Sequence, residues 1–262
     1  MVVVSRWWLL ILPSSNLVRL QQRNKALIRE LTLGGRPLGA HLPNMNHQDV
    51  FALMTKIPAT VTEFILVRHG QTIWNSQGRW QGWLNSPLSE LGVQQAQVAR
   101  DALREVPLEA AYCSDTGRAK QTAEIILEPH GLALIEVEGL REKYYGKWEG
   151  LNVAEIDANY PGTRFDDSRD QRATHRPPDG ETMVEVRARV KDFLTDLAGK
   201  ERGRRVLLVA HSGVVRAVDS LCSDQRFDDI WHRTPPNACM MIFQVDDAGR
   251  FHMVKDFIAP EG

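Results

Sequence analysis

The stretch Phe64-Ile65-Leu66-Val67-Arg68-His69-Gly70 places an arginine and a histidine directly after a short apolar run. A second stretch, Val206-Leu207-Leu208-Val209-Ala210-His211-Ser212-Gly213, repeats this arrangement later in the chain. Short apolar runs bounded by polar residues and glycine are typical of buried strands. The carboxyl ends of parallel strands lie at one edge of an open α/β sheet, where ligands bind. We therefore expect His69 and His211 to meet at that edge.

Strands and helices are expected to alternate through most of the chain. Residues 89–105, for example, place Leu91, Ala96, Ala99 and Leu103 on one helical face, and Ser89 is a suitable N-cap. This alternation predicts an α/β fold with three layers (α/β/α), a doubly wound, mostly parallel sheet and a single domain. The expected strands are 62–67, 110–113, 133–137 and 205–210, the other helices are 118–127, 152–158, 181–197 and 213–221, and residues 238–245 and 251–257 form a terminal antiparallel hairpin.

The first sixty residues differ in character from the rest of the chain. We expect residues 1–58 to be an N-terminal extension that is poorly ordered or not native, and residues 59–262 to form the domain. The apolar run 7–12 is far shorter than the roughly 20 residues that a membrane span needs. The segment 16–31 is amphipathic, rich in arginine and poor in acidic residues, so it could instead serve as a transit peptide. A third alternative is that translation begins at an internal methionine, Met45 or Met54.

Composition limits the classes of partner. The 262 residues carry a net charge of −1, so nothing general favours nucleic acid or an anionic membrane, and any recognition of phosphate must be local. The three cysteines, Cys113, Cys222 and Cys239, show no metal-ligand spacing and are expected to be reduced in a cytoplasmic protein. No His or Cys pair has the spacing of metal ligands either. We expect no metal, no cofactor, no nucleic acid and no membrane partner.

Five ordered blocks carry a family resemblance that neither histidine carries alone. In chain order they are Leu66 to Asn75 with Arg79 to Trp83 and Leu88 to Gly92, then Ser114 to Ala123, Leu140 to Gly150, Asp179 to Thr182, and Ala210 to Gly213. Together they resemble the histidine phosphatase superfamily, also called phosphoglycerate mutase-like. A lone histidine at a strand end is more often a structural, hydrogen-bonded residue, but five blocks in the family's order make that interpretation poor.

The resemblance implies a role for each residue of the site. His69 is the expected nucleophile, neutral and with one ring nitrogen holding its proton against a nearby carbonyl. Glu142 is the expected proton donor to the leaving group and then the base for water. Arg68, Arg118 and His211 are expected to surround the phosphate oxygens. The expected substrate or phosphate contacts are Arg68, Asn75, Gln81, Gly82, Arg118, Glu142, Tyr145, His211 and Ser212. Glu181 either has a role in the site or only suits a helix start.

The outer pocket distinguishes a phosphatase from a mutase. Mutases of the family typically hold phosphoglycerate with a lysine and an Arg-Arg pair, but this chain has Val153 at the lysine position and no such pair between Tyr160 and Pro177. Each lost charge-assisted bond is worth roughly 1.5 to 3 kcal/mol. We therefore expect a metal-independent phosphomonoesterase that acts on small-molecule phosphate esters. The alternatives are a bisphosphoglycerate-dependent mutase and a non-catalytic phospholigand-binding module. The family often forms homodimers, so a homodimer is a possible assembly.

Overall fold

The computed structural model describes residues 57–164, 172–223 and 234–258. The chain divides into two compact units, Met1–Ala40 and His41–Gly262, and the first lies wholly outside the described residues. The prediction of an N-terminal extension over residues 1–58 therefore falls almost entirely outside them. Within the described ranges, no helix combines the length and the apolar character that crossing a membrane requires.

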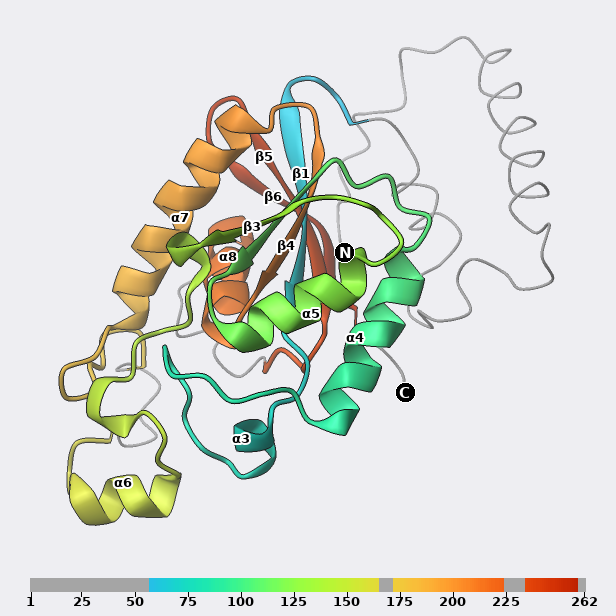
Figure 1. Cartoon of the computed structure of the whole chain (residues 1–262). Coiled ribbons are helices and arrows are strands. Elements are labelled where there is room, and N and C mark those ends of the chain that lie inside the picture. The colour runs from blue at the N-terminus through green and yellow to red at the C-terminus, as the bar shows by residue number, and fades with distance from the viewer. Residues whose placement is uncertain (1–56, 165–171, 224–233, 259–262) are drawn as a thin grey trace, which may run out of the picture. The chain divides into compact units, whose positions relative to one another are not determined.

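The centre of the fold is a six-stranded sheet in the order β3-β2-β4-β1-β5-β6 (Figure 1). The first four strands in this order are mutually parallel, and β5 and β6 add an antiparallel pair next to β1. The prediction of a mostly parallel sheet with a terminal hairpin is confirmed. The strand bounds are β1 (Val61–Arg68), β2 (Ala110–Ser114), β3 (Leu134–Val137), β4 (Arg205–Ala210), β5 (Met240–Asp246) and β6 (Phe251–Ile258).

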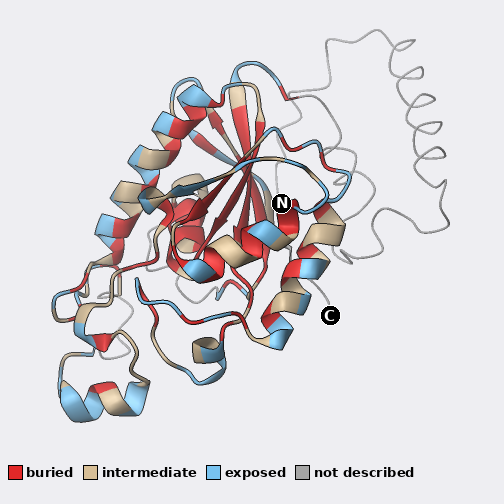
Figure 2. Cartoon of the chain, in the orientation of Figure 1, coloured by how far each residue is buried: buried red, intermediate tan, exposed pale blue. Residues whose placement is uncertain are grey.

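Two pairs of helices cover the two faces of the sheet, which confirms the three-layer α/β/α prediction (Figure 1). Helices α4 (Glu90–Leu103) and α5 (Gly117–Leu127) pack on one face, and α7 (Met183–Lys200) and α8 (Ser212–Ser223) pack on the other. In β1, Ile65 and Val67 face the first pair, whereas Phe64 and Leu66 face the second. The central strands are therefore buried on both sides (Figure 2), which is why they read as continuous apolar runs.

Shorter elements lie between the strands and helices that periodicity predicts. Helix α3 (Ile73–Ser76) is not among the helices that the sequence predicts, and a capping box of Thr72 and Asn75 holds it. Two 3₁₀ turns, Glu138–Leu140 and Gly146–Trp148, flank the segment that carries Glu142. Helix α6 (Val153–Asn159) corresponds to the expected helix 152–158, and Asn152 is its N-cap. Elements of one turn show too little periodicity for the sequence alone to reveal them.

Candidate active site

His69 and His211 follow β1 and β4, which are neighbouring parallel strands in register up to Arg68 and Ala210. The His69 N–H donates to the carbonyl oxygen of Ala210 at 2.9 Å, so the two strand ends remain side by side beyond the sheet. The ring centroids are 5.2 Å apart with an interplanar angle of 62°. The prediction that both rings meet at one edge of the sheet is confirmed.

The protonation of His69 follows from its surroundings. Its Nδ1 lies 2.7 Å from the Gly70 carbonyl oxygen, which can only accept, so Nδ1 carries the proton. Burial lowers the pKa of His69 well below its usual range, and the positive charges of Arg118 and Arg68 lower it further. The ring is therefore neutral near pH 7, and its Nε2 holds a free electron pair.

Two guanidinium groups beside the histidines are held by carbonyl oxygens instead of carboxylates. Arg118 is 1% exposed and donates from Nη1 to Leu84 at 2.7 Å and from Nη2 to Gly82 at 2.6 Å. Arg68 donates from Nη1 to the Pro235 carbonyl. Neither has an ion-pair partner among the described residues, and the Nε of each is buried without a hydrogen bond there. Burial lowers the pKa of Arg118 to about 10, which leaves it charged at pH 7. Two charged donors without a counter-ion favour an anion.

The Glu142 carboxylate lies against the start of helix α8, at Gly213, which comes two residues after His211. It accepts the Gly213 N–H, with distances of 3.0 Å to Oε1 and 3.2 Å to Oε2, and the Lys143 N–H at 2.8 Å. A Cβ atom on Gly213 would stand 2.1 Å from Glu142 Oε1, so a larger residue there would displace the Glu142 carboxylate from its present position. The backbone N–H groups at a helix start favour an anion. The structure places the Glu142 carboxylate at the Gly213 N–H.

His211 is buried, and only one of its two ring nitrogens has a hydrogen-bond partner in the described part of the chain. Its Nε2 lies 3.2 Å from the Thr116 hydroxyl oxygen. Its Nδ1 is buried and has no hydrogen-bond partner among the residues that the structure describes. Burial lowers the pKa of His211 well below its usual range, and the positive charges of Arg118 and Arg68 act in the same direction. His211 is thus a neutral ring with one nitrogen left for a further contact.

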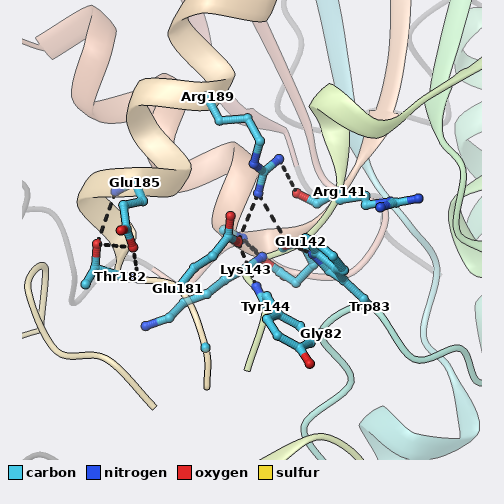
Figure 3. Close-up of polar contacts among 12 residues, drawn as sticks. Gly82, Trp83, Arg141, Glu142, Lys143, Tyr144, Glu181, Thr182, Glu185 and Arg189 are labelled. Carbon is cyan, nitrogen blue, oxygen red and sulfur yellow. Dashed lines mark hydrogen bonds and ion pairs between the residues drawn. The ribbon is translucent and has the colours of Figure 1, made fainter. Parts of the chain in front are cut away.

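The segment around Glu142 is held by three side chains from two distant parts of the chain (Figure 3). The Trp83 indole N–H donates to the Glu142 carbonyl oxygen at 3.0 Å. Arg189, from helix α7, donates to carbonyl oxygens of the same segment, and Glu181 accepts the Tyr144 N–H at 2.9 Å. Segments far apart in sequence therefore converge on the residue that we expect to carry the proton.

Glu149 organises the loop that supports Arg118, and we had assigned it no role. Its carboxylate accepts the N–H groups of Trp83 at 2.9 Å, Tyr145 at 3.1 Å and Leu84 at 3.3 Å. Gly82 lies at the same point with φ +55°, and a Cβ there would stand 1.8 Å from Glu149 Oε1. Gly82, which we predicted as a ligand contact, also has a structural task, because its carbonyl oxygen accepts from Arg118.

The other predicted substrate contacts are Asn75, Gln81, Tyr145 and Ser212, and each has a different environment. Asn75 uses Oδ1 to accept the Thr72 N–H at 3.1 Å in the α3 capping box, and a contact with phosphate would use its Nδ2 amide group instead. Gln81 is buried, and its Oε1 has no partner within the described part of the chain. The Tyr145 ring packs edge-on against Trp80, and the Ser212 hydroxyl accepts from Arg216 at 3.0 Å. These roles in binding stay predictions.

Asn237, Lys143 and Arg216 are close to the site and were not predicted. The Asn237 side-chain amide donates to the His69 carbonyl oxygen at 3.1 Å, and a lone asparagine before a strand gives no signal of this. The Lys143 amine donates to the His175 carbonyl at 3.2 Å, and burial lowers its pKa to about 8. Arg216 lies one turn after Ser212 on α8, a spacing that could have revealed it. Within the described ranges, no group of three His, Cys, Asp or Glu side chains is arranged to hold a metal ion.

The comparisons with known proteins agree with this geometry. Residues 64–256 match the family model of the histidine phosphatase superfamily (branch 1). The chain belongs to this superfamily. A metal-independent phosphoserine phosphatase of Arabidopsis thaliana is 38% identical over 166 residues, which cover 62% of this chain and 69% of the relative. A 2,3-bisphosphoglycerate-dependent phosphoglycerate mutase of Gloeobacter violaceus is 35% identical over 159 residues, covering 59% and 72% of the two chains.

The solved structures support the same fold. A mycobacterial glucosyl-3-phosphoglycerate phosphatase in complex with VO3 aligns with a TM-score of 0.66 and 31% identity over 74% of this chain and 98% of its own. The phosphoglycerate mutase-like fold is thus confirmed. Phosphatases and mutases both occur among the relatives, and the phosphatases, together with the missing charged residues of the outer pocket, favour hydrolysis. The protein is a histidine phosphatase, and the mutase alternative is not favoured.

Proposed function

We propose that the protein is a metal-independent phosphomonoesterase that acts on small-molecule phosphate esters through a phosphohistidine on His69. One observation carries the proposal. A neutral imidazole with Nδ1 bound to the Gly70 carbonyl faces His211 beside two guanidinium groups that have no carboxylate partner among the described residues. This arrangement combines a free electron pair with positive charge where the phosphoryl group would sit.

In the first step, His69 Nε2 attacks the phosphorus atom, and the bond from phosphorus to the ester oxygen breaks. The leaving oxygen takes a proton from the Glu142 carboxyl group and departs as an alcohol. The guanidinium groups of Arg68 and Arg118 and the N–H of His211 hold the three equatorial oxygens, whose charge is spread out in the transition state.

In the second step, water attacks the phosphorus atom of the phosphohistidine. The Glu142 carboxylate takes a proton from the water, the P–N bond breaks, and its electron pair returns to Nε2. The sum of both steps is ester plus water giving alcohol plus inorganic phosphate, and Glu142 ends with the proton that it had at the start.

Additional positive charge favours a substrate with a second anionic group. Lys143 directly follows Glu142, and Arg216 lies on α8 near Glu142 and Tyr145. Phosphoserine and glucosyl-3-phosphoglycerate, named for two relatives, each carry a carboxylate near the phosphate. We include a neighbouring carboxylate in the proposed substrate, so phosphoserine should be turned over with a higher kcat/KM than phosphoethanolamine, which lacks it.

The covalent intermediate gives the decisive test. Wild-type enzyme with a phosphate-labelled ester should form an adduct that survives alkali and is lost in acid, with turnover independent of bisphosphoglycerate and of EDTA. His69→Ala should abolish both adduct and turnover. Turnover by His69→Ala, or an adduct stable in acid and lost in alkali, would contradict the role of His69, since the latter marks an acyl phosphate.

A further inference from the structure

The block Asp179 to Thr182 contains Glu181, whose role the proposed mechanism leaves unassigned. Glu181 lies just before helix α7, and Arg189 follows two turns later on the side of the helix that faces the Glu142 segment (Figure 3). Arg189 Nη2 and Glu181 Oε2 are 3.2 Å apart. We propose that these two residues, the Glu181–Arg189 clamp, position Glu142 for proton transfer. The inference rests on the role of Glu142 in the proposed function.

Arg189 makes the first half of the clamp by holding carbonyl oxygens on the chain leading to Glu142. Its Nη1 donates to Gly139 at 3.1 Å and to Arg141 at 3.0 Å, and its Nη2 lies 3.4 Å from the Glu142 carbonyl oxygen. A planar guanidinium can serve several acceptors at fixed angles, which a lysine amine cannot reproduce. One side chain thus fixes the path of the backbone up to Glu142.

Glu181 makes the second half by holding the residues after Glu142. Its Oε2 accepts the Tyr144 N–H at 2.9 Å, and its own N–H donates to the Tyr144 carbonyl oxygen at 2.8 Å. The same Oε2 receives Arg189, so one carboxylate oxygen joins the two halves (Figure 3). The backbone is gripped on both sides of Glu142 by partners that do not touch the Glu142 carboxylate.

These contacts matter for proton transfer because the backbone around Glu142 is irregular. Residues 141–145 lie between two 3₁₀ turns, so no ladder of backbone hydrogen bonds sets their direction. Proton transfer needs the two heavy atoms within about 2.6 to 3.2 Å. A displacement of about 1 Å can lower a rate on the order of 100-fold. Both side chains of the clamp are partly exposed, at 25% and 22%, so their ion pair by itself adds little to folding.

The test compares poor and good leaving groups. In Arg189→Lys and Glu181→Gln, kcat/KM for alkyl phosphates should fall about 10-fold or more, whereas kcat/KM for nitrophenyl phosphate should fall less than about 3-fold, because nitrophenolate departs without a proton. The plot of log kcat/KM against leaving-group pKa should therefore become steeper, toward the slope of Glu142→Gln. kcat/KM is the suitable quantity, since it includes only the steps up to alcohol release.

Glu185→Gln is the matched control. Glu185 lies at the same helix start, pairs with Arg176 and accepts the Thr182 N–H, and these contacts do not reach the Glu142 segment (Figure 3). Its slope should equal that of the wild type. Glu181→Gln changes the charge without changing shape, so it keeps the test valid if Arg189→Lys folds poorly.

The outcomes separate the clamp from the proposed function. An unchanged slope in Arg189→Lys and Glu181→Gln, or equal losses on both substrate classes, would overturn the clamp if Glu142→Gln still steepens the slope. If Glu142→Gln leaves the slope unchanged, Glu142 is not the acid, and the clamp fails with it. Absence of an acid-labile adduct in the wild type would instead refute the proposed function itself.

Discussion

Thr116 shows how a single hydroxyl group can decide which nitrogen of the His211 ring carries the proton. A neutral imidazole carries one proton, and His211 has Nε2 at 3.2 Å from the Thr116 oxygen. The Ser114 hydroxyl lies 3.3 Å from the same oxygen, so Ser114 can donate to Thr116 while Thr116 donates to His211. The proton of His211 is then on Nδ1, which has no other partner in the described part of the chain and can donate to a phosphate oxygen.

Without the Thr116 hydroxyl group, the proton of His211 should no longer be confined to Nδ1. In Thr116→Val we expect kcat/KM to fall about 10-fold, the equivalent of one ordinary hydrogen bond, while Thr116→Ser restores it. The ¹⁵N shifts of the His211 ring should move toward a mixture of tautomers in the valine variant only. Thr62→Val is the control, because Thr62 loses a buried hydroxyl bond to Ala198 at the far end of β1. Unchanged ¹⁵N shifts in Thr116→Val would refute the assignment.

At the residue scale, the spacing of the motifs in the sequence identifies the predicted site residues. The side chains that hold them in place are found only in the structure. The ordered blocks place Arg68, His69 and His211 at strand ends, and the structure brings them together. Asn237 contacts the His69 carbonyl oxygen only because the chain before β5 returns beside β1, and local sequence carries no trace of that contact. Long-range contacts of single polar side chains require the fold to be known.

At the scale of elements, helix α4 meets the loop after His69 through two glycines. A Cβ on Gly92 would stand 1.9 Å from the Gln71 carbonyl oxygen, and a Cβ on Gly70 would stand 2.3 Å from the Gly92 carbonyl oxygen. Both obstacles are backbone atoms, which cannot rotate away. The N-cap Ser89 also donates its N–H to Gln71 at 2.8 Å, so the helix start and the His69 loop form one unit.

Gly92→Ala therefore has two effects on stability that oppose each other. Alanine favours a helix interior by about 1 kcal/mol over glycine, but overpacking typically costs about 1 to 3 kcal/mol, and we expect packing to prevail. The variant should unfold at lower urea concentration and lose activity, because the Gly70 carbonyl that orients His69 would move. Gly199→Ala in α7 is the control: nothing lies within 4 Å of its Cβ, so it should gain stability. If Gly92→Ala instead stabilises the protein, the loop after His69 can move away from the added methyl group at little cost.

The sequence predicts the long helices and strands better than the short ones, because only the long elements show a recognisable apolar pattern. Periodicity and the Ser89 cap indicate α4 with nearly the right start, and β1 appears as an apolar run because both of its faces are buried. Helix α3 is a single turn that depends on its Thr72–Asn75 capping box and on pairing of Thr72 with Leu88. Its stability comes from local and tertiary bonds, which leave no repeating pattern.

At the scale of the whole molecule, a chain with a net charge of −1 places at one edge of its sheet two guanidinium groups that have no ion-pair partner in the described ranges. Burial and the charges of Arg68 and Arg118 keep His69 and His211 neutral in the folded protein. In the unfolded chain both titrate near their ordinary value of 6.5. As pH falls through about 6.5, the unfolded state binds protons that the folded state refuses, so stability is lost on the acid side.

The size of this effect can be isolated with one substitution. A difference of one bound proton changes the free energy of unfolding by about 1.4 kcal/mol per pH unit. His69→Asn keeps a donor for the Gly70 carbonyl and removes the titrating group. The loss of unfolding free energy between pH 6 and pH 5, from urea denaturation, should therefore shrink by about 1 kcal/mol relative to the wild type, and His211→Asn should act alike. If both variants lose stability as steeply as the wild type, the two rings take up protons equally in the folded and unfolded states, and His69 would then be largely cationic at pH 5 and unable to attack phosphorus.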